Sequence, residues 1–361
     1  MKAVRYDAVG ATPQLVEVPE PACPPGGAVL AVHATGVCRS DWHAWAGHEP
    51  VPLPHVPGHE MAGQVLVVGA GVLRWRPGDR VTLPFVCGCG VCAYCAAGEP
   101  QVCPHQTQPG FTGPGTFAEQ VAVHAADTNL VALPPGLDDV AAASLGCRFA
   151  TAYRAVAQHA RVQPGQWLAV HGCGGVGLSA VMIGVALGAK VLAVDVSRAA
   201  LDRAAELGAS AVLDVAALSG SDEVGSAVRE LTQDGAHASV DALGSAATAV
   251  ASVLSLRRRG RHVQVGLLHG GGATPPLPMD RVVAQELELY GSHGMAAADY
   301  PPMLALVAQG RLRPDLLVGS VVGLEHAGAA LMAMGEPGTA AGMTVVQVRA
   351  GRERPPRPAR E

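Results

Sequence analysis

The stretch that decides the fold runs from Gln166 to Ala186 and reads QWLAVHGCGGVGLSAVMIGVA. Gln166 to His171 has the pattern of a short buried strand, and Val176 to Ala186 is an apolar stretch of helix length. Between them lies a G-x-G-x-x-G turn, Gly172-Cys173-Gly174-Gly175-Val176-Gly177. In a chain rich in glycine such a turn alone is weak evidence, but here strand, turn and helix are in register. The stretch therefore predicts a dinucleotide-binding βαβ unit and an α/β fold.

The glycines of this turn have separate physical tasks. They permit a tight turn, let the backbone approach a pyrophosphate and let the helix pack closely on the strand, with the phosphates at the helix N-terminus. Asp195 follows the second strand, Val191 to Val194, where its carboxylate would accept hydrogen bonds from the adenosine ribose and repel a 2'-phosphate. This favours NAD over NADP. Arg198 lies close by, where its positive charge could weaken the preference for NAD. Alternatively, it is an exposed charge at the start of a helix. The expected cofactor contacts are Gly172, Gly174, Gly175, Val176, Gly177, Asp195 and Arg198.

Strand-like and helical segments go on alternating beyond this unit. The strand-like runs are Ala211–Leu213, Ala238–Val240 and His262–Val265, which predicts a parallel α/β sheet. Residues 1 to about 150 instead show short runs such as Ala28–Val32 and Gln64–Val68 between turn residues, which predicts a compact β-rich domain. After Tyr290 the pattern is mixed, and the final GRERPPRPARE is expected to be disordered.

Length and composition favour two domains and a small-molecule partner. The chain has 361 residues, of which 49% are hydrophobic, enough for two sizeable cores. Only 15% are charged and the net charge is -5, so no basic footprint for nucleic acid or an anionic membrane is present. No apolar run approaches the ~20 residues of a membrane span, and the N-terminus does not resemble a secretory signal. We expect a cytoplasmic protein.

Four cysteines form a C-x2-C-x2-C-x7-C run: Cys89, Cys92, Cys95 and Cys103. Thiolates bind zinc tetrahedrally, and short spacings let one loop fill all four positions, which is typical of a closed, structural site. Two disulfides are the alternative, but they need an oxidising compartment. Cys87 lies just outside the pattern, and Cys23, Cys87 and Cys173 have no assigned role. Cys173 lies in the phosphate turn, where a helix N-terminus could lower its pKa.

A second metal-ligating set is spread along the first 150 residues. Cys38, His59 and Cys147 would leave one coordination position open for water or substrate, as in a catalytic zinc site. Spacing alone does not assemble these three, because a lone cysteine or histidine is more often part of the core.

The motifs together resemble those of a known family. Gly36-Val37-Cys38-Arg39-Ser40-Asp41, Gly58-His59-Glu60, the four-cysteine loop and the glycine turn, in this order, are similar to the zinc-dependent alcohol dehydrogenases of the medium-chain dehydrogenase/reductase superfamily. The resemblance extends roughly from Lys2 to Val348. It implies a GroES-like β-rich catalytic domain, residues 1–152 and 291–350, and a Rossmann coenzyme domain with a doubly wound parallel sheet, residues 153–290. Residues 351–361 would form the disordered tail.

The resemblance also implies residue roles. Cys38, His59 and Cys147 would bind the catalytic zinc, with Glu60 as an occasional or outer ligand and Asp41 orienting His59. Ser40 and His43 would form a proton relay through the cofactor ribose, although Ser40 and Asp41 also fit a helix N-cap pair. The remaining cofactor contacts implied are Arg39 at the pyrophosphate, and Thr151, Leu243, Gly244, Val265, Gly266 and Leu267 around the nicotinamide half.

The implied reaction is hydride transfer between an apolar primary or secondary alcohol and NAD, giving an aldehyde or ketone. Cys147 as third ligand favours an alcohol dehydrogenase, because polyol dehydrogenases tend to have Glu there. A polyol or thiol-adduct dehydrogenase, or an NADPH-linked aldehyde reductase, remains the alternative on this scaffold. Phe85 and Trp45 would line the substrate channel or serve as core aromatics, and His48 would lie at its mouth. His293 is expected to be structural.

Two further expectations follow from the resemblance. Many relatives carry an arginine near the last strand that contacts the cofactor phosphates, whereas this chain reads Gly342-Met343-Thr344-Val345, so its cofactor affinity is expected to be lower. A homo-oligomer, a tetramer or a dimer, is also expected.

Overall fold

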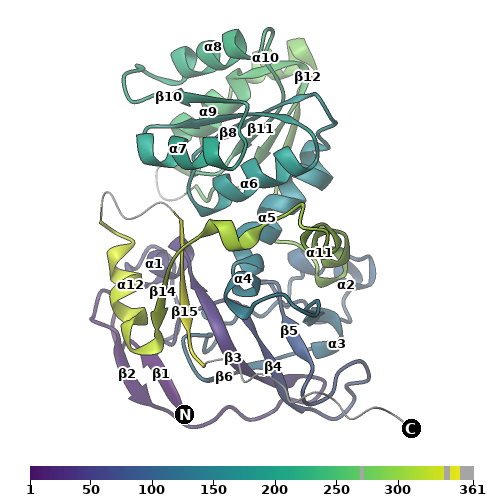
Figure 1. The fold of residues 1–361 in the computed structure, drawn as a ribbon, viewed down its shortest axis with the longest axis vertical. Coiled ribbons are helices and arrows are strands. Elements are labelled where there is room, and N and C mark those ends of the chain that lie inside the picture. The colour runs from purple at the N-terminus through teal and green to yellow at the C-terminus, as the bar shows by residue number, and fades with distance from the viewer. Residues whose placement is uncertain (269–271, 337–341, 350–361) are drawn as a thin grey trace.

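The structure is a computed structural model that describes residues 1–268, 272–336 and 342–349; the predicted tail, 351–361, lies outside the described residues. Figure 1 shows two parts stacked along the long axis. The upper part is built around a parallel sheet, and the lower part contains strands from both the beginning and the end of the chain.

The upper sheet has six strands in the order β10-β9-β8-β11-β12-β13, and every described pair is parallel. This is the strand order of a doubly wound dinucleotide-binding fold, in which ligands bind beyond the carboxyl ends of the strands where the order reverses. The strands are β8 (Trp167–His171), β9 (Lys190–Asp195), β10 (Ala211–Asp214), β11 (Ala236–Asp241), β12 (Leu256–Gln264) and β13 (Glu288–Gly291). The helices that alternate with them are α6 (Gly175–Ala186), α7 (Arg198–Glu206), α8 (Ser221–Leu231), α9 (Ala246–Leu254) and α10 (Met279–Gln285).

The lower part is a mixed sheet in which the two ends of the chain meet. Its order is β14-β15-β3-β4-β5-β7, with β6 pairing with β3, and only β14 and β15 are parallel among the described pairs. The strands are β3 (Ala28–Val37), β4 (Glu60–Val68), β5 (Arg80–Thr82), β6 (Gln120–Val123), β7 (Val131–Ala132), β14 (Val318–Gly323) and β15 (Met343–Gln347). A separate antiparallel pair joins β1 (Lys2–Arg5) to β2 (Gln14–Glu17).

Short helices connect and flank the sheets. They are α1 (Arg39–Trp45), α2 (Ala93–Ala96), α3 (Ala126–Asn129), α4 (Asp139–Ala143), α5 (Ala150–Tyr153), α11 (Tyr300–Ala308) and α12 (Ala327–Ala333). Two π-helical turns, Leu145–Phe149 and Arg154–Ala160, flank α5 where the chain passes from the lower to the upper part. The Tyr300 hydroxyl of α11 donates a hydrogen bond to the Gly146 carbonyl, 3.1 Å away, and so ties the returning chain to this passage.

The predicted fold class is confirmed, and the predicted strands agree closely with those observed. The strand expected at His262–Val265 is the end of β12, which stops at Gln264. The alternative interpretation of Ser40 and Asp41 as a helix N-cap pair is correct only in part: Asp41 belongs to the capping box of α1, but Ser40 is not its N-cap. Cys38 is the N-cap of α1, and Asp41 is at the third helical position, where its carboxylate accepts the backbone N–H of Cys38.

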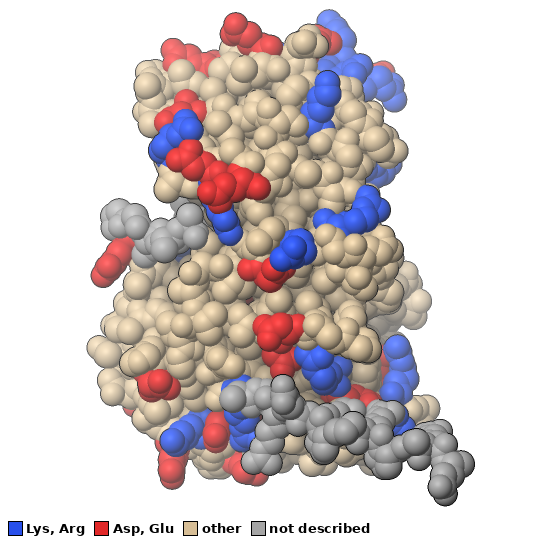
Figure 2. All heavy atoms as spheres, viewed as in Figure 1, with Lys and Arg blue, Asp and Glu red and all other residues tan. Residues whose placement is uncertain are grey.

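The surface is sparsely charged. Figure 2 shows charged side chains of both signs scattered over the face in view, with uncharged surface between them. Among the described residues, no helix combines the length and the apolar character needed to cross a bilayer.

Candidate active site

The glycine turn after β8 has the geometry that its residue types predict. Gly172 has φ of +90°, in the left-handed region that favours glycine. A Cβ atom at Gly177 would lie 1.8 Å from the carbonyl oxygen of Gly172, so only glycine lets α6 pack so close to the turn. A Cβ atom at Gly174 would instead meet no described atom within 4 Å beyond its own chain neighbours. The backbone is therefore open at the position where a pyrophosphate would approach, with Val176 in the first turn of α6.

Asp195 ends β9 and lies against the glycine turn. Its carboxylate accepts hydrogen bonds from the backbone N–H of Cys173, at 2.6 Å, and of Ser197, at 2.8 Å. The charge is thus fixed beside the turn, with lone pairs left for ribose hydroxyls. Arg198 pairs with Asp202 on its own helix, 2.7 Å away, and its side chain is 68% exposed. The structure therefore agrees with the simpler interpretation of Arg198 as an exposed charge.

The loops after β11 and β12 meet beside the same turn. A Cβ atom at Gly172 would lie 3.0 Å from Cβ of Leu243, and one at Gly266 would lie 2.2 Å from the backbone nitrogen of Gly244. Leu243 is 61% exposed, and Val265 is half-buried. Asp241, which the sequence did not single out, accepts the N–H groups of Leu243 and Gly244 and so fixes this loop. Of the residues expected around the nicotinamide half, the loop residues thus lie together: Leu243, Gly244, Val265, Gly266 and Leu267.

Four side chains come together in a second group, three of them buried and that of Cys147 half-buried: Cys38, His59, Glu60 and Cys147, whose candidate ligand atoms are all within 4.8 Å of one another. Asp41 holds the histidine in place. Its Oδ1 lies 2.9 Å from Nδ1 of His59 and also accepts the backbone N–H of Gly58, while Oδ2 accepts the N–H of Cys38. Both side chains of the Asp41–His59 pair are fully buried. The bond to Asp41 leaves Nε2 as the nitrogen available to a metal.

This donor set fits a zinc ion. Nε2 of His59 is buried and has no hydrogen-bond partner among the described residues, which is costly unless a ligand binds it. Burial opposes the charge of His59, but Asp41 and Cys38 outweigh it and raise its pKa, so a metal at Nε2 would displace a proton. The neighbouring thiol of Cys147 lowers the pKa of Cys38, which favours the thiolate that a metal needs. Two sulfurs and an imidazole are ligands that zinc prefers.

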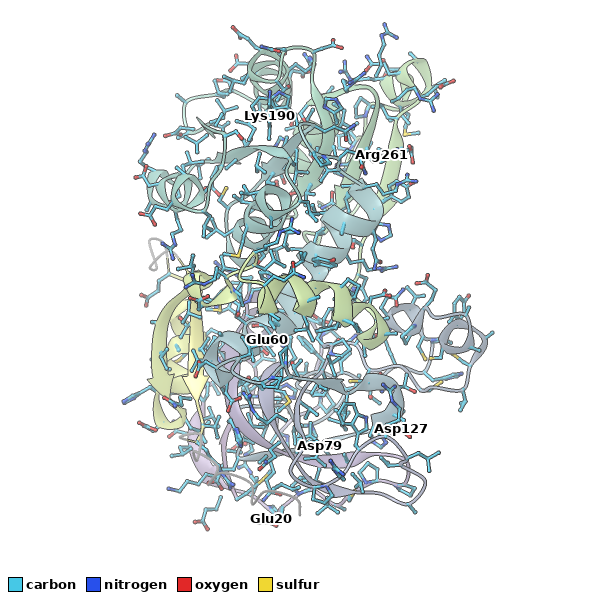
Figure 3. The ribbon with its side chains drawn as sticks, turned by 45° about the vertical axis from the view of Figure 1, so that its right-hand side comes forward. Glu20, Glu60, Asp79, Asp127, Lys190 and Arg261 are labelled. Atoms are coloured by element: carbon cyan, nitrogen blue, oxygen red, sulfur yellow. The ribbon has the colours of Figure 1, made fainter. Side chains whose placement is uncertain are left out.

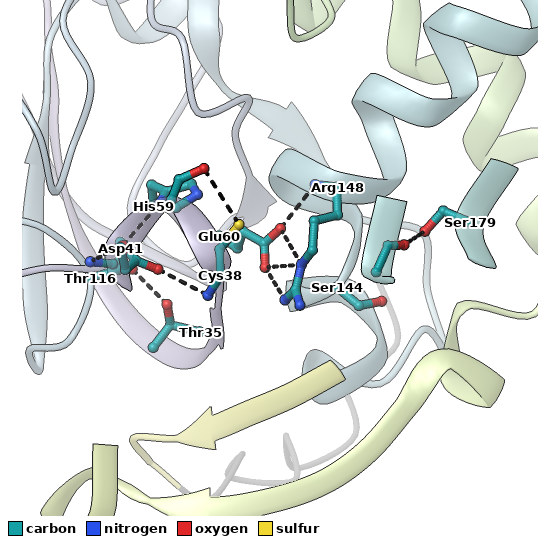
Figure 4. A network of polar contacts seen from close by, with 12 residues as sticks. Thr35, Cys38, Asp41, His59, Glu60, Thr116, Ser144, Arg148 and Ser179 are labelled. Atoms are coloured by element: carbon teal, nitrogen blue, oxygen red, sulfur yellow. Dashed lines mark hydrogen bonds and ion pairs between the residues drawn. The ribbon is translucent and has the colours of Figure 1, made fainter. Parts of the chain in front are cut away.

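Glu60 is held by an arginine that the sequence analysis missed. The backbone N–H of Arg148 donates to Oε1 at 2.9 Å, its Nε lies 3.0 Å from the same oxygen, and Nη2 pairs with Oε2. The side chains are 0% and 7% exposed. Burial opposes the charge of Arg148, but Glu60 outweighs it and raises the pKa of the guanidinium. Figure 3 places Glu60 in the middle of the molecule, and Figure 4 shows its carboxylate facing Arg148. An arginine directly after Cys147 in an apolar stretch was the available clue.

Helix α1 carries the expected relay residues. Oγ of half-buried Ser40 lies 3.8 Å from Sγ of Cys38. His43 is also half-buried, and its Nδ1 lies 2.9 Å from Nδ1 of His48, which is exposed. The guanidinium of Arg39 is exposed and lies over the ring of Trp42, 5.2 Å from its centroid. The helix thus leads from the metal-ligating group to the surface.

Aromatic rings lie beside the metal-ligating histidine. The ring centroids of Phe85 and Phe111 lie 6.0 and 5.0 Å from that of His59, and His293 packs edge-on against Phe85 at 5.1 Å. Sequence reasoning missed Phe111, which no nearby motif marks. Trp45 donates to the carbonyl of Ala11 at 2.7 Å and packs against the hydrophobic core, which fits the core interpretation.

Thr151 lies on α5 and is 6% exposed. Its Oγ1 is buried without a hydrogen-bond partner among the described residues. A cofactor that accepts a hydrogen bond from this hydroxyl would give it the missing partner.

The four cysteines of the C-x2-C-x2-C-x7-C run also come together, with candidate ligand atoms within 4.8 Å of one another: Cys89, Cys92, Cys95 and Cys103. All four are free thiols, so the disulfide alternative is not realised in the structure. Sγ of Cys103 accepts the backbone N–H groups of Cys89 and His105, at 3.4 and 3.3 Å. Backbone N–H groups of Val91 and Cys92 lower the pKa of Cys89 to about 6, which favours the thiolate that a metal needs.

The unassigned cysteines give one correction. Burial raises the pKa of Cys173 to about 12, so the expectation of a lowered pKa at the helix N-terminus was wrong. Burial also raises the pKa of Cys87 to about 12. Cys23 is half-buried near backbone carbonyls.

The fold and the site together define a dehydrogenase class: a parallel dinucleotide-binding sheet beside a mixed sheet that carries a Cys2His group. Residues 24–135 match the family model of the alcohol dehydrogenase GroES-like domain, and residues 175–309 match that of the zinc-binding dehydrogenases. An alcohol dehydrogenase of Geobacillus stearothermophilus is 32% identical over 317 residues, 87% of this chain and 90% of that protein. A sorbitol dehydrogenase of Halalkalibacterium halodurans is 31% identical, covering 84% and 86% of the two chains.

Solved structures agree with the sequence relatives. An alcohol dehydrogenase from Thermus sp. ATN1 superposes with a TM-score of 0.88 at 32% identity, over 97% of this chain and all of that one. The chain belongs to the zinc-dependent alcohol dehydrogenases of the medium-chain dehydrogenase/reductase superfamily. It is an alcohol oxidoreductase.

Proposed function

We propose that the protein oxidises apolar primary or secondary alcohols with NAD at a zinc ion held by Cys38, His59 and Cys147. The observation that carries this proposal is the Cys2His group, in which Nε2 of His59 is buried and has no hydrogen-bond partner among the described residues. Glu60 is engaged by Arg148 and would take part as an outer or occasional ligand only. A second, structural zinc would be held by Cys89, Cys92, Cys95 and Cys103.

The residues around the catalytic group have separate tasks. A zinc ion held there would supply Lewis acidity, which lowers the pKa of a hydroxyl group beside it. The Ser40 hydroxyl, next to Cys38, would accept the substrate's proton while giving up its own. His43, bonded to exposed His48, would carry the proton to solvent. Phe85 and Phe111 would hold an apolar substrate and exclude water.

The cofactor proposal depends on the fixed charge at the end of β9. Asp195 would accept hydrogen bonds from the ribose hydroxyls of NAD and repel the 2'-phosphate of NADP. Arg198, engaged with Asp202, does not offset that repulsion. Arg39 and Thr151 would contact the pyrophosphate and the nicotinamide.

Steady-state NADH formation tests the proposal. Primary, secondary, benzylic and polyol substrates would be compared with NAD and NADP on a preparation of measured zinc content. Turnover of a simple alcohol with NAD and about two zinc ions per chain supports it. The sorbitol dehydrogenase relative makes polyol oxidation the second candidate, and turnover of polyols alone would favour that candidate.

Three broader proposals concern the whole protein. We propose a catalytic domain of residues 1–152 and 291–350 and a coenzyme domain of residues 153–290. We also propose a reducing compartment such as the cytoplasm, because a zinc site of four thiolates requires reduced cysteines. Exposed Met279 and Val283 on α10 offer apolar surface for a homo-oligomer, which sedimentation would test.

A further inference from the structure

Arg148 lies between the two parts of the site, the metal-ligating group and the phosphate turn. It follows Cys147 in the π-helical turn Leu145–Phe149, and its side chain is only 7% exposed. Nε and Nη2 donate to the carboxylate of Glu60 (Figure 4). A guanidinium has five N–H donors in a planar fork, so this ion pair occupies one edge and leaves the other for a second anion.

The second edge faces the start of α6. Nη1 of Arg148 donates no hydrogen bond within the part of the chain that the structure describes, and a Cβ atom at Gly175 would lie 3.3 Å from it. The same Cβ atom would lie 2.6 Å from Cδ of Arg148, so glycine is required for this close approach. Figure 4 shows Arg148 between Glu60 and the helix that carries Ser179.

Nη1 lies beside the N-terminus of α6, which is the kind of backbone position that attracts anions. Gly175 is the first residue of α6, a helix of 12 residues, and it follows Gly174, beside which the space is open. The free N–H groups and the dipole at a helix N-terminus attract negative charge. A buried cation with an unused donor and a helix N-terminus therefore converge on one place, although they come from different parts of the fold.

We propose that Arg148 binds the diphosphate of the dinucleotide through Nη1, and that Glu60 positions Arg148 by holding Nε and Nη2. The inference rests on the proposed dinucleotide function and adds a binding residue to it. Glu60 balances the charge of Arg148 before the ligand arrives, and the fixed guanidinium loses little conformational freedom when the diphosphate binds.

Binding measurements on the zinc-loaded full chain test the role of Arg148. The probes are ADP-ribose, which carries the diphosphate without the nicotinamide, and adenosine, which carries no phosphate. Arg148→Gln is expected to raise the dissociation constant of ADP-ribose by about 10- to 100-fold, the usual cost of a lost charged hydrogen bond. Adenosine binding is expected to stay unchanged. Arg148→Lys keeps the charge and should recover part of the affinity.

A double-mutant cycle tests the role of Glu60. It also includes a variant in which no buried charge is left unpaired, so that the test does not depend on the folding of Arg148→Gln alone. Arg148→Gln leaves the buried Glu60 without a counter-charge, whereas the variant that combines it with Glu60→Gln replaces the ion pair by two neutral amides. If Glu60 acts through Arg148, Glu60→Gln weakens ADP-ribose binding in the parent chain and adds nothing once Arg148 is replaced. Arg154→Gln is the matched control, since Arg154 is 12% exposed, pairs with Glu99 and is expected not to affect ADP-ribose.

Each outcome is decisive. An unchanged ADP-ribose dissociation constant in the folded double variant overturns the inference, and so does an equal loss for adenosine, which would indicate a structural role. Failure of the parent chain itself to bind ADP-ribose and NADH would contradict the proposed function instead.

Discussion

Asp41 controls the metal-ligating histidine through a single carboxylate. It accepts hydrogen bonds from His59, Gly58 and Cys38, and so fixes the imidazole orientation and two backbone segments at once. We expect Asp41→Asn to lower zinc affinity by about 10- to 100-fold, because an amide orients the imidazole without the negative charge that strengthens it as a ligand. Competition with a zinc chelator measures this.

A similar pair elsewhere provides the control for Asp41. Asp139 contacts Nδ1 of His33 at 2.8 Å and also pairs with Arg80, away from the metal-ligating group. Asp139→Asn should cost stability but leave zinc affinity unchanged. Equal zinc affinity in Asp41→Asn and the parent chain would show that Asp41 does not strengthen the metal site.

Asp195 is predicted to decide the cofactor. Asp195→Gly should raise the ratio of kcat/KM with NADP to kcat/KM with NAD by about tenfold or more, since a like charge at the 2'-phosphate is removed. Asp214→Gly is the matched control, because Asp214 ends the neighbouring strand and accepts a backbone N–H at 2.9 Å in the same manner. An equal ratio in both variants would show that Asp195 does not set the preference.

For single residues, the sequence predicted the chemical role of a side chain better than it predicted which other side chains lie next to it. Cys38, His59 and Cys147 were grouped through a resemblance, because their separation in the chain hides their proximity. Arg148 and Phe111 escaped notice because neither belongs to a spaced motif. Their roles depend on a π-helical turn and a loop whose course is set by tertiary packing.

At the element scale, the four-cysteine loop is predicted to act as a separate metal-dependent unit. Cys103→Ala should lower the zinc content from about two to about one per chain and reduce the melting temperature, because a metal held by four cysteines of one loop stabilises the fold of that loop. Metal analysis and thermal unfolding check both effects. Cys87→Ala is the control: Cys87 is equally buried, but its high pKa keeps it a neutral thiol outside the ligand set. Loss of zinc from Cys87→Ala, or none from Cys103→Ala, would contradict this assignment.

A buried histidine in the parallel sheet makes the stability of the fold depend on pH. His171 ends β8, and burial lowers its pKa to about 3, so the folded chain keeps it neutral. The unfolded chain binds a proton there below a pKa of about 6.5, so stability falls as the pH drops from about 6.5 towards 3.

Replacing His171 should therefore flatten the acid side of the stability profile. Relative to the parent, His171→Leu should gain about 2 kcal/mol between pH 7 and pH 5, because the variant no longer offers the proton site to the unfolded chain. Ser255, the partner at 3.4 Å, keeps its bond to the Ser252 carbonyl, so no new unpaired group arises. Urea unfolding at the two pH values measures the difference. A stability gap that is the same at both would refute the explanation.

For the whole molecule, local sequence patterns predicted which part of the chain forms a parallel sheet and which part is β-rich. They did not predict which distant strands pair with one another. The buried apolar runs of β8 and β9 gave the parallel sheet because such strands have no solvent face. That β15 pairs with β3, more than 300 residues earlier, depends on long-range register that periodicity cannot show; only the resemblance implied it.

The joint between the two parts is a shared hydrophobic core. One cluster of buried residues contains Phe149 beside the metal-ligating turn, Leu168 and Ile183 of the parallel sheet and its first helix, and Tyr300 and Met343 of the returning chain. Unfolding either part alone would expose the apolar surface of the other, which couples their free energies of unfolding.

We therefore predict that the zinc-loaded chain unfolds in one cooperative transition, although it has two sheets. Unfolding followed by the indole of Trp167, in the parallel sheet, should coincide with unfolding followed by Trp75, in the lower part, each in a chain from which the other tryptophans have been replaced. Two separated transitions would show that the shared cluster does not bind the parts together, and that residues 153–290 fold as an independent unit.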